Sequence, residues 1–398
     1  MDRTEWREEI MRVPVFDTHT HLNMPGVPVP AQNFWDIAHY FWFQEELWSV
    51  GYPSNAMDLA EDERIARFVA AFDAGRNTAW NGIVRRIFRD LYGVEVGDAA
   101  SVRAADAAVR EHAAQPDWAR SVIDRLAIRR IAVNNTRDSD FPELPGVGVA
   151  VPSWEGFAAW TEKLAQAENP RAVGEQARAA IAEAVTTYYA AGLRGMRVEA
   201  DPFEAGGRAA VDAPDDLPPG PITALQAATF LTHALFHALS EHGMFAQLFL
   251  GIKRDVGAHT AMAVNDPRRI TNLYPLFERH ACDFELVIGA PQNNMDAAQP
   301  ARIYPNVHVG GLWWYNFRPS TYDEALQARF EAVPACKSAI VASDARCIEW
   351  CYGKVLLVKM LLADFLYNQI DHGWIDREGA LWVAREWLHD AAARRYLG

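Results

Sequence analysis

The chain has 398 residues, of which 50% are hydrophobic and 23% are charged, which is enough to bury the large core of one α/β domain. Its formal net charge of −14 argues against nucleic acids and anionic membrane surfaces as partners. The charged N-terminus lacks an apolar core of signal-peptide length, no stretch approaches 18 uninterrupted apolar residues, and the four cysteines form no CxxC pair. We therefore expect a reduced, cytoplasmic protein, and its sequence is compatible with a homo-oligomer.

The first predicted strand covers residues 13–16, a β-branched and aromatic run that leads into Asp17, His19 and His21. Residues i and i+2 of a strand point to the same side about 6.6 to 6.8 Å apart, so the two histidines should share a face. Imidazole nitrogens bind a divalent ion at about 2.0 to 2.1 Å, so this pair can converge on one metal ion. The alternative is a pair of loop histidines before the turn at Pro25 and Gly26.

Eight short apolar runs predict strands, and helical patterns separate most of them. The predicted strands cover residues 13–16, 131–133, 147–151, 196–198, 245–250, 284–288, 307–314 and 339–342. The predicted helices cover residues 160–191, 225–239, 270–277, 322–330 and 355–366. Alternating helices and strands, with strands apolar on both faces, indicate a parallel sheet. Eight repeats favour a closed (β/α)8 TIM-like barrel over an open sheet.

Three segments depart from a regular alternation. Residues 56–125 are too long for one crossover and carry 3.6-period apolar patterns, which predicts a helical insertion after the first strand, within a single domain of residues 1–398. Residues 137–146 are too short for a crossover helix, so we expect a loop there. Residues 201–220 are rich in Pro, Gly and Asp and predict another loop.

Active sites of such barrels lie at the C-terminal ends of the strands, so the polar and aromatic residues that end the apolar runs are the candidates. They are Asp17, His19, His21, Arg197, Glu199, Asp201, Gln247, Lys253, Arg254, Trp313, Trp314, Tyr315, Asn316, Ser343, Asp344 and Arg346. The first and last strands are neighbours when a barrel closes, so His19, His21 and Asp344 can hold one metal ion. Three protein ligands leave a position open for water or substrate.

Several of these residues have two interpretations. Asp344 can be a metal ligand and a general base, or it can cap the helix that follows. Arg346 can clamp a substrate carboxylate with two hydrogen bonds, or pair with Asp344. Trp313 and Trp314 can form an apolar wall beside a substrate, or pack in the core. At least one of the two should pack, because adjacent strand residues face opposite ways.

Four stretches resemble a known family. FDTHTHL at residues 16–22 resembles the first-strand signature of the amidohydrolase superfamily. Three more resemble the uronate (glucuronate) isomerases, one branch of it: NFWDIAHYFWFQEELWSVGYP at 33–53 with the helical stretch up to FRDLYGVE, NVHVGGLWWYNF at 306–317, and ASDAR at 342–346. The resemblance implies a distorted (β/α)8 barrel, one divalent metal, commonly zinc, and aldose–ketose isomerisation of a sugar acid of the glucuronate or galacturonate type.

Carried over position by position, the resemblance implies that His19 and His21 are metal ligands and that Asp344 is the metal-bound proton carrier. It also implies that Tyr40 is a loop residue that reaches the site.

The resemblance further implies that Arg346 binds substrate and that Trp313 lines the substrate position, and Trp314 is the second residue of the same double-Trp segment. For isomerisation through an enediolate, we expect Arg346, with Arg197 or Arg318, to hold the substrate carboxylate.

The family pattern is not kept everywhere. Its fifth-strand Gln-Leu-His-x-Gly reads Gln-Leu-Phe-Leu-Gly at residues 247–251, so Phe249 stands where the family has His. Its Ser-Asp-His-Gly after the fourth strand aligns with residues 196–199, and an Arg expected after the third strand falls near Ser153. Two alternatives therefore stay open: a mononuclear metal hydrolase acting on an amide, lactone or ester, and a barrel that binds a sugar acid without turning it over.

Overall fold

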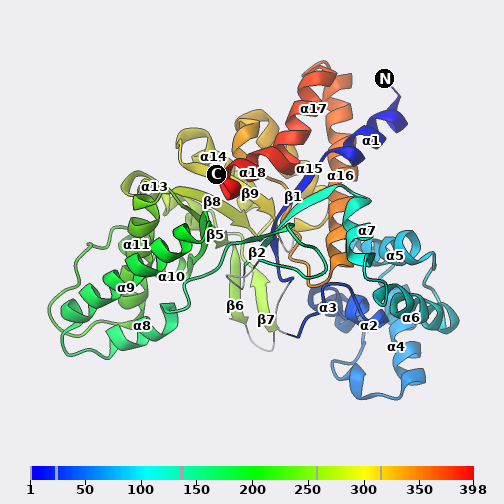
Figure 1. Ribbon diagram of the computed structural model, residues 1–398, viewed down its shortest axis with the longest axis horizontal. Coiled ribbons are helices and arrows are strands. Elements are labelled where there is room, and N and C mark those ends of the chain that lie inside the picture. The colour runs from blue at the N-terminus through cyan, green and yellow to red at the C-terminus, as the bar shows by residue number, and fades with distance from the viewer. Residues whose placement is uncertain (1, 23–25, 135–138, 257–258, 314–315) are drawn as a thin grey trace.

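Two parallel sheets lie at the centre of the molecule (Figure 1). The computed structural model describes residues 2–22, 26–134, 139–256, 259–313 and 316–398. One sheet contains, in order, β1 (Val15–Thr20), β2 (Ile128–Val133) and β3 (Gly148–Ala150). The other contains β4 (Gly195–Glu199), β5 (Phe245–Leu250), β8 (Asp283–Ile288) and β9 (Val307–Leu312). All pairs within these two sheets are parallel, as the alternation of strands and helices predicts.

The eighth predicted strand, residues 339–342, is not a regular strand, and this expectation was wrong. Isolated parallel bridges take its place, and they join Ser338 to Val309, Val341 to Leu312 and Ala345 to Thr20. A Cβ on Gly311 would lie 2.4 Å from the carbonyl carbon of Val341, so only glycine permits this close approach. Segment 338–345 therefore lies between β9 and β1 and links the two sheets.

Helices flank the sheets on opposite sides (Figure 1). One group contains α8 (Phe157–Ala165), α9 (Pro170–Ala190), α10 (Asp201–Val211) and α11 (Ala224–Glu241). The opposite group contains α2 (Phe34–Ala38), α3 (Phe41–Ser49), α4 (Glu61–Ala74), α5 (Ala79–Tyr92), α6 (Ala99–Ala113) and α7 (Trp118–Asp124). The second group includes the region where the sequence predicts a helical insertion.

The remaining helices complete the layer around the sheets. They are α1 (Arg3–Arg12), α12 (Arg268–Thr271), α13 (Tyr274–Arg279), α14 (Asn293–Ile303), α15 (Pro319–Ala332), α16 (Ile348–Asp371), α17 (Arg377–Arg385) and α18 (Ala391–Leu397), with short turns of helix at Ala56–Asp58, Ala335–Lys337 and Glu386–Asp390. α16 is central, because it packs against α1, α5, α7, α15 and α17. Among the described residues, no helix combines the length and the apolar character needed to cross a membrane.

β1 is buried along its whole length although four of its six residues are polar. Its threonines are satisfied by backbone carbonyls: Thr18 Oγ1 donates to Val341 O at 2.8 Å, and Thr20 Oγ1 donates to Ala132 O at 2.8 Å. Buried polar side chains are tolerated when they are hydrogen-bonded. These bonds hold β1 between β2 and segment 338–345, which fixes the direction of the side chains that alternate with the threonines.

Three further expectations differ from the structure. Residues 201–220 begin with α10 rather than a loop, because Phe203 and Val211 bury on one face, although Gly207 breaks the helix with φ 56°. Residues after β5 do not end a strand at Lys253 but form an antiparallel hairpin of β6 (Ile252–Val256) and β7 (His259–Ala263). Residues 160–191 contain two helices, which are separated where Pro170 starts α9.

Candidate metal centre

Three side chains converge at the C-terminal end of β1. Nε2 of His19 and Nε2 of His21 lie 3.0 and 3.1 Å from the same carboxylate oxygen, Oδ1 of Asp344. One ligand atom from each of the three residues lies within 4.8 Å of the other two. Zinc bound at about 2.0 to 2.2 Å keeps neighbouring tetrahedral ligands roughly 3.3 Å apart, so a small outward movement would admit an ion. The structure brings together the three predicted metal ligands.

The backbone of segment 338–345 directs the carboxylate of Asp344 toward β1. Asp344 has φ 57°, a left-handed conformation that side chains other than glycine adopt rarely and that Asp tolerates better than most. Its N–H donates to His19 O at 2.8 Å. The preceding N–H, of Ser343, donates to Oδ1 of Asp17 at 2.9 Å. The side chain of Asp17 and the backbone of His19, both in β1, thus fix the turn that carries Asp344.

The second oxygen of Asp344 is held by α3 and the residue before it. Tyr40 Oη donates to Oδ2 at 3.0 Å and to the Asp344 carbonyl at 2.9 Å. Trp42 Nε1 donates to Oδ2 at 2.7 Å. Burial raises the pKa of the Asp344 carboxyl, but the close contacts with His19 and His21 outweigh burial and hold the pKa well below its usual range. The carboxylate is therefore ionised at neutral pH.

His19 is fully buried, and burial lowers its pKa to about 4 although the adjacent Asp344 carboxylate opposes the shift, so the imidazole is neutral at pH 7. Its Nδ1 lies 2.6 Å from Oδ1 of Asn134. A neutral imidazole has one N–H, and if Nδ1 carries it, the lone pair of Nε2 faces a carboxylate oxygen. A cation between the two atoms would remove the electrostatic repulsion between this lone pair and the carboxylate oxygen. The imidazole nitrogens of His19 and His21 and the carboxylate of Asp344 are ligands that suit a divalent metal ion.

A buried lysine supports this arrangement from α16. Lys354 Nζ donates to Tyr40 Oη at 2.7 Å and to the carbonyl of Ser343. Rings of Tyr40, Trp80 and Phe317 surround the ammonium with centroids 4.3, 4.8 and 4.8 Å away. Burial lowers the pKa of Lys354 to about 8, although nearby carboxylates oppose the shift. Lys354 thus braces the turn and the tyrosine that hold Asp344.

Apolar side chains line the side of the centre away from Asp344. The ring of Phe249 lies 4.6 Å from that of His19, and Trp313 lies 4.8 Å from Phe249 and 5.8 Å from His19, measured between centroids. Ile252 packs in the same cluster. The guanidinium of Arg197 stacks 4.8 Å from the centre of the Phe249 ring, and its charge contributes to lowering the pKa of His19. Trp313 and Arg197 therefore both lie next to the three converging side chains.

The remaining predicted residues lie further out or outside the described part. Arg346 is exposed, and its guanidinium lies 5.7 Å from the ring centre of Phe41. Among the described residues, the Asp344 carboxylate contacts the imidazoles of His19 and His21, the hydroxyl of Tyr40 and the indole of Trp42. Arg346 is not one of these contacts. Arg318 is exposed at the residue before α15. Trp314 lies outside the described residues.

Sequence analysis missed three residues that contact the centre. Asn134 directly follows β2, so the same search for polar residues at strand ends could have found it. Lys354 is the one lysine in an apolar stretch of α16 from Trp350 to Val358, which is a signal of a buried charge. Trp42 lies beside Tyr40 in a predicted loop, and nothing in its spacing indicates which aromatic residue donates to Asp344.

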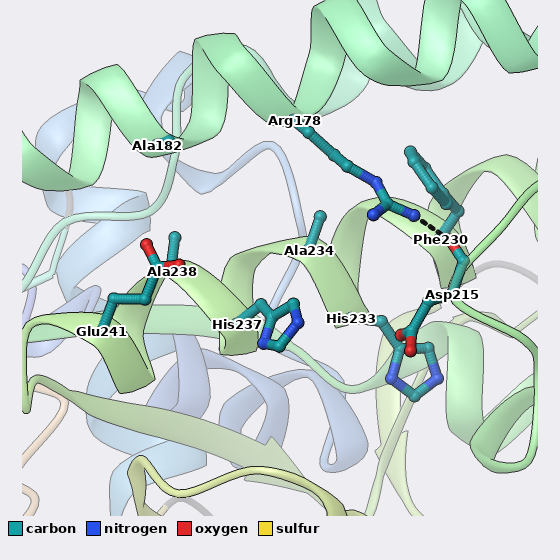
Figure 2. A pocket seen from close by; sticks show the side chains of 9 residues that line it. All are labelled: Arg178, Ala182, Asp215, Phe230, His233, Ala234, His237, Ala238 and Glu241. Atoms are coloured by element: carbon teal, nitrogen blue, oxygen red, sulfur yellow. Dashed lines mark hydrogen bonds between the residues drawn. The ribbon is translucent and has the colours of Figure 1, made fainter.

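Away from the metal centre, a hollow of about 220 Å³ lies between α9 and α11 (Figure 2). It is lined by Arg178, Ala182, Asp215, Phe230, His233, Ala234, His237, Ala238 and Glu241. Arg178 donates a hydrogen bond to the backbone carbonyl of Asp215. The histidines and carboxylates that line this hollow do not converge on one point. Among the described residues, the group whose ligand atoms lie close enough to share an ion is His19, His21 and Asp344. None of the predicted site residues lines this hollow.

No protein-family model matches the chain, and no curated protein matches it. Solved structures do match. A uronate isomerase from Thermotoga maritima has a TM-score of 0.76 at 12% identity, with 99% of this chain and 97% of that chain covered. An uronate isomerase from Bacillus halodurans has a TM-score of 0.74 at 15% identity, with 99% and 96% covered.

A glucuronate isomerase from Caulobacter crescentus has a TM-score of 0.76 at 16% identity, with 99% of this chain and 93% of that chain covered. These structures match along almost the whole length, although few residues are identical. The resemblance predicted from short motifs is confirmed at the level of the fold: this chain has the fold of the uronate isomerases.

Proposed function

We propose that the protein is a metal-dependent enzyme that interconverts an aldose and a ketose sugar acid, of the glucuronate or galacturonate type. The observation that carries this proposal is the convergence of His19, His21 and Asp344 on one point, in a chain that has the fold of the uronate isomerases. Arg197, beside that point, supplies a positive charge for a carboxylate. The partner is then a small-molecule sugar acid, and the four free cysteines support a cytoplasmic location.

The proposed architecture is a distorted (β/α)8 barrel in one domain. Seven parallel strands and segment 338–345 would form the ring. Two contacts support closure: the bridges of segment 338–345 to both β9 and β1, and the N–H of Arg197 in β4, which donates to Pro152 O after β3 at 3.1 Å. A ring places the C-terminal ends of β1, β4, β5 and β9 around one opening, where His19, Arg197, Phe249 and Trp313 lie.

In this proposal Arg197 holds the substrate carboxylate, with Arg346 and Arg318 reaching in from the rim. Guanidinium groups suit this task because they donate two parallel hydrogen bonds. Trp313 packs against the carbon skeleton and excludes water. The divalent ion, most simply zinc on this ligand set, would polarise the carbonyl and stabilise negative charge as it develops.

Asp344 is the proposed proton carrier, and Tyr40 is the catalytic residue that orients it. Asp344 is ionised, so it can accept the proton from C2 of the aldose, directly or through one water molecule, and return it to C1. The hydroxyl proton at C2 moves to the former carbonyl oxygen, and the intermediate is an enediolate. Tyr40 Oη lies 3.0 Å from Asp344 Oδ2 and keeps the carboxylate oriented during the transfer. Atoms balance without uptake of water.

One observation favours a second reaction, hydrolysis of an amide, lactone or ester. Phe249 stands where the resembled family has His, and its ring, which packs against Trp313, offers no hydrogen bond to a sugar hydroxyl. The same three ligands and Asp344 as base suit activation of water. The products distinguish the reactions, because hydrolysis adds the mass of one water and isomerisation leaves the mass unchanged.

The experiment combines elemental analysis of the purified protein with an activity screen. Glucuronate, galacturonate, a lactone and an amide are incubated with the metal-loaded protein in deuterated water, and products are measured by mass spectrometry and NMR. The proposal expects one divalent ion per chain, a ketose of unchanged mass, and deuterium incorporated into recovered substrate. A product heavier by one water supports hydrolysis instead, and full metal occupancy without any turnover supports a barrel that only binds.

A further inference from the structure

A chain of buried side-chain hydrogen bonds leads away from the back of His19. Nδ1 of His19 lies 2.6 Å from Asn134 Oδ1, and Asn134 Nδ2 donates to Gln247 Oε1 at 2.6 Å. Gln247 Nε2 donates to Glu285 Oε1 at 3.1 Å. Asn134, Gln247 and Glu285 are 1%, 0% and 0% exposed, so every bond of this chain is shielded from water. The four residues come from β1, the end of β2, β5 and β8, which are four separate strands.

The direction of this chain is fixed by groups that can only accept. Gln247 Nε2 also donates to Thr18 O at 3.0 Å, and Asn134 Nδ2 also contacts Val151 O at 3.3 Å. Backbone carbonyls carry no proton to donate, so both amide groups must turn their NH2 toward these carbonyls. Asn134 therefore presents its carbonyl oxygen to His19, and Nδ1 of His19 must carry the hydrogen.

The far end of the chain is anchored by the C-terminal helix. Glu285 pairs with Arg395 through Oε2 and accepts from Tyr396 Oη at 2.6 Å through Oε1. Arg395 and Tyr396 both belong to α18. The pairing with Arg395 and the hydrogen bond from Tyr396 hold the Glu285 carboxyl group in place, and it anchors the amide groups that lead toward His19.

We propose that Asn134, Gln247 and Glu285 are positioning residues that hold His19 as the Nδ1–H tautomer, so that Nε2 presents a lone pair to the metal. The opposite tautomer would place N–H on Nε2, where it would donate to Asp344 Oδ1 at 3.0 Å and close the site to an ion. A buried chain that runs to α18 thus makes the metal centre depend on Arg395 and Tyr396. This inference rests on the proposed metal centre and is independent of the proposed reaction.

The first test reads the tautomer in the metal-free protein, with no substrate present. Long-range ¹H–¹⁵N NMR of histidine-labelled protein distinguishes Nδ1–H from Nε2–H, and the His19→Gln variant assigns the signal. The expected result is Nδ1–H for His19 at pH 7. A predominant Nε2–H tautomer in the wild-type protein would overturn the proposal, and this reading needs no folded variant of the chain itself.

The second test removes or strengthens the acceptor. Asn134→Leu should shift His19 toward Nε2–H and weaken zinc binding by about 10- to 100-fold, which is the usual effect of losing such an outer partner. Asn134→Asp keeps an acceptor for Nδ1–H and should retain the tautomer, although it loses the hydrogen bonds that Nδ2 donates to Gln247 Oε1 and Val151 O. The matched control is Asn81→Leu, because Asn81 is likewise buried but donates to Phe72 O in the helical region.

Zinc affinity is measured by competition with a chelator, and folding by circular dichroism. If Asn134→Leu binds zinc within threefold of the control variant, the chain does not position His19 and the proposal fails. If Asn134→Asp shifts His19 to Nε2–H like Asn134→Leu, the acceptor is not what matters, and the proposal also fails. Absence of isomerase activity would contradict only the proposed function, since neither readout uses substrate.

Discussion

The two walls of the candidate metal centre differ in kind. The polar wall comes from β1, segment 338–345, α3 and α16, and it consists of Asp17, His19, His21, Tyr40, Trp42, Asp344 and Lys354. The apolar wall comes from β5, the hairpin after it and the end of β9, and it consists of Phe249, Ile252 and Trp313, with Arg197 stacked on Phe249. On the polar wall both carboxylate oxygens of Asp344 are bonded; on the apolar wall ring contacts dominate.

The difference separates two tasks. Hydrogen bonds are directional, so the polar wall can hold ligand atoms within a few tenths of an ångström of the geometry that a metal ion needs. Apolar contacts are not directional, so the apolar wall sets shape and excludes water without fixing a substrate hydroxyl. Changes to the polar wall should therefore act on metal binding and stability, and changes to the apolar wall should act on substrate choice.

The largest effect is expected for Asp344→Asn. The variant keeps the shape of the side chain but removes the negative charge that faces the two histidines at 3.0 and 3.1 Å. Bound metal should fall below one tenth of an ion per chain, and kcat/KM should fall by about 10²- to 10⁴-fold. Elemental analysis and steady-state kinetics measure both. Asp364→Asn, which alters a surface carboxylate paired with Arg3 and Arg7, should change neither.

Asp17 offers a pH-dependent test of the polar wall in the metal-free protein. Burial raises the pKa of Asp17 from 3.8 to about 6, against the opposing hydrogen bonds from Ser343. Between pH 4 and 6 the unfolded chain has lost this proton while the folded chain retains it, so the free energy of unfolding should fall as pH rises through this window. The full loss is on the order of 3 kcal/mol.

Asp17→Asn cannot ionise, so this part of the pH dependence should disappear. Chemical unfolding of both proteins at pH 4, 5, 6 and 7 gives the difference in free energy, in which the other titrating groups cancel. The variant should gain stability over the wild type as pH rises from 4 to 7. A difference that stays flat across this range would mean that Asp17 is ionised in the folded protein already at pH 4.

The polar wall was predictable from sequence to a greater extent than the apolar wall. His19, His21 and Asp344 follow apolar runs, and strand periodicity with barrel topology places such residues together. Asn134 obeys the same rule. Lys354 and Trp42 do not, because their contacts depend on how helices α16 and α3 pack, and sequence periodicity gives no helix orientation of that accuracy.

The strands were predictable because parallel strands buried on both faces are continuous apolar runs. The same reasoning predicts a strand at residues 339–342, but the left-handed Asp344 and the close approach of Gly311 interrupt the ladder in segment 338–345. The β6–β7 hairpin was missed because its sequence is mixed in character and follows a strand without a Pro or Asn-Gly turn signal. Local composition does not report such tertiary pairings.

Arg197→Met tests whether the positive charge on the apolar wall holds a carboxylate. The expected result is a 10- to 100-fold rise in KM with kcat changed much less, since a hydrogen bond to a charged group contributes about 1.5–3 kcal/mol. The matched control is Arg194→Met, because Arg194 also stacks on an aromatic ring, 5.0 Å from Tyr189. If KM is unchanged, or if Arg194→Met has the same effect, the carboxylate is held elsewhere.

The smallest effect, and the most informative about substrate, is expected for Phe249→His. An imidazole there would lie beside His19 and could donate to a substrate hydroxyl, and one such bond contributes about 0.5–1.5 kcal/mol, or roughly 2- to 13-fold in kcat/KM for a sugar acid. Phe245→His places the same change four residues earlier on the same face of β5, against Tyr396. The Phe245→His variant should lower the free energy of unfolding without raising activity. If Phe249→His instead lowers turnover of a lactone and leaves uronates untouched, the apolar wall recognises a substrate with an apolar face, and the chain has diverged from sugar acids.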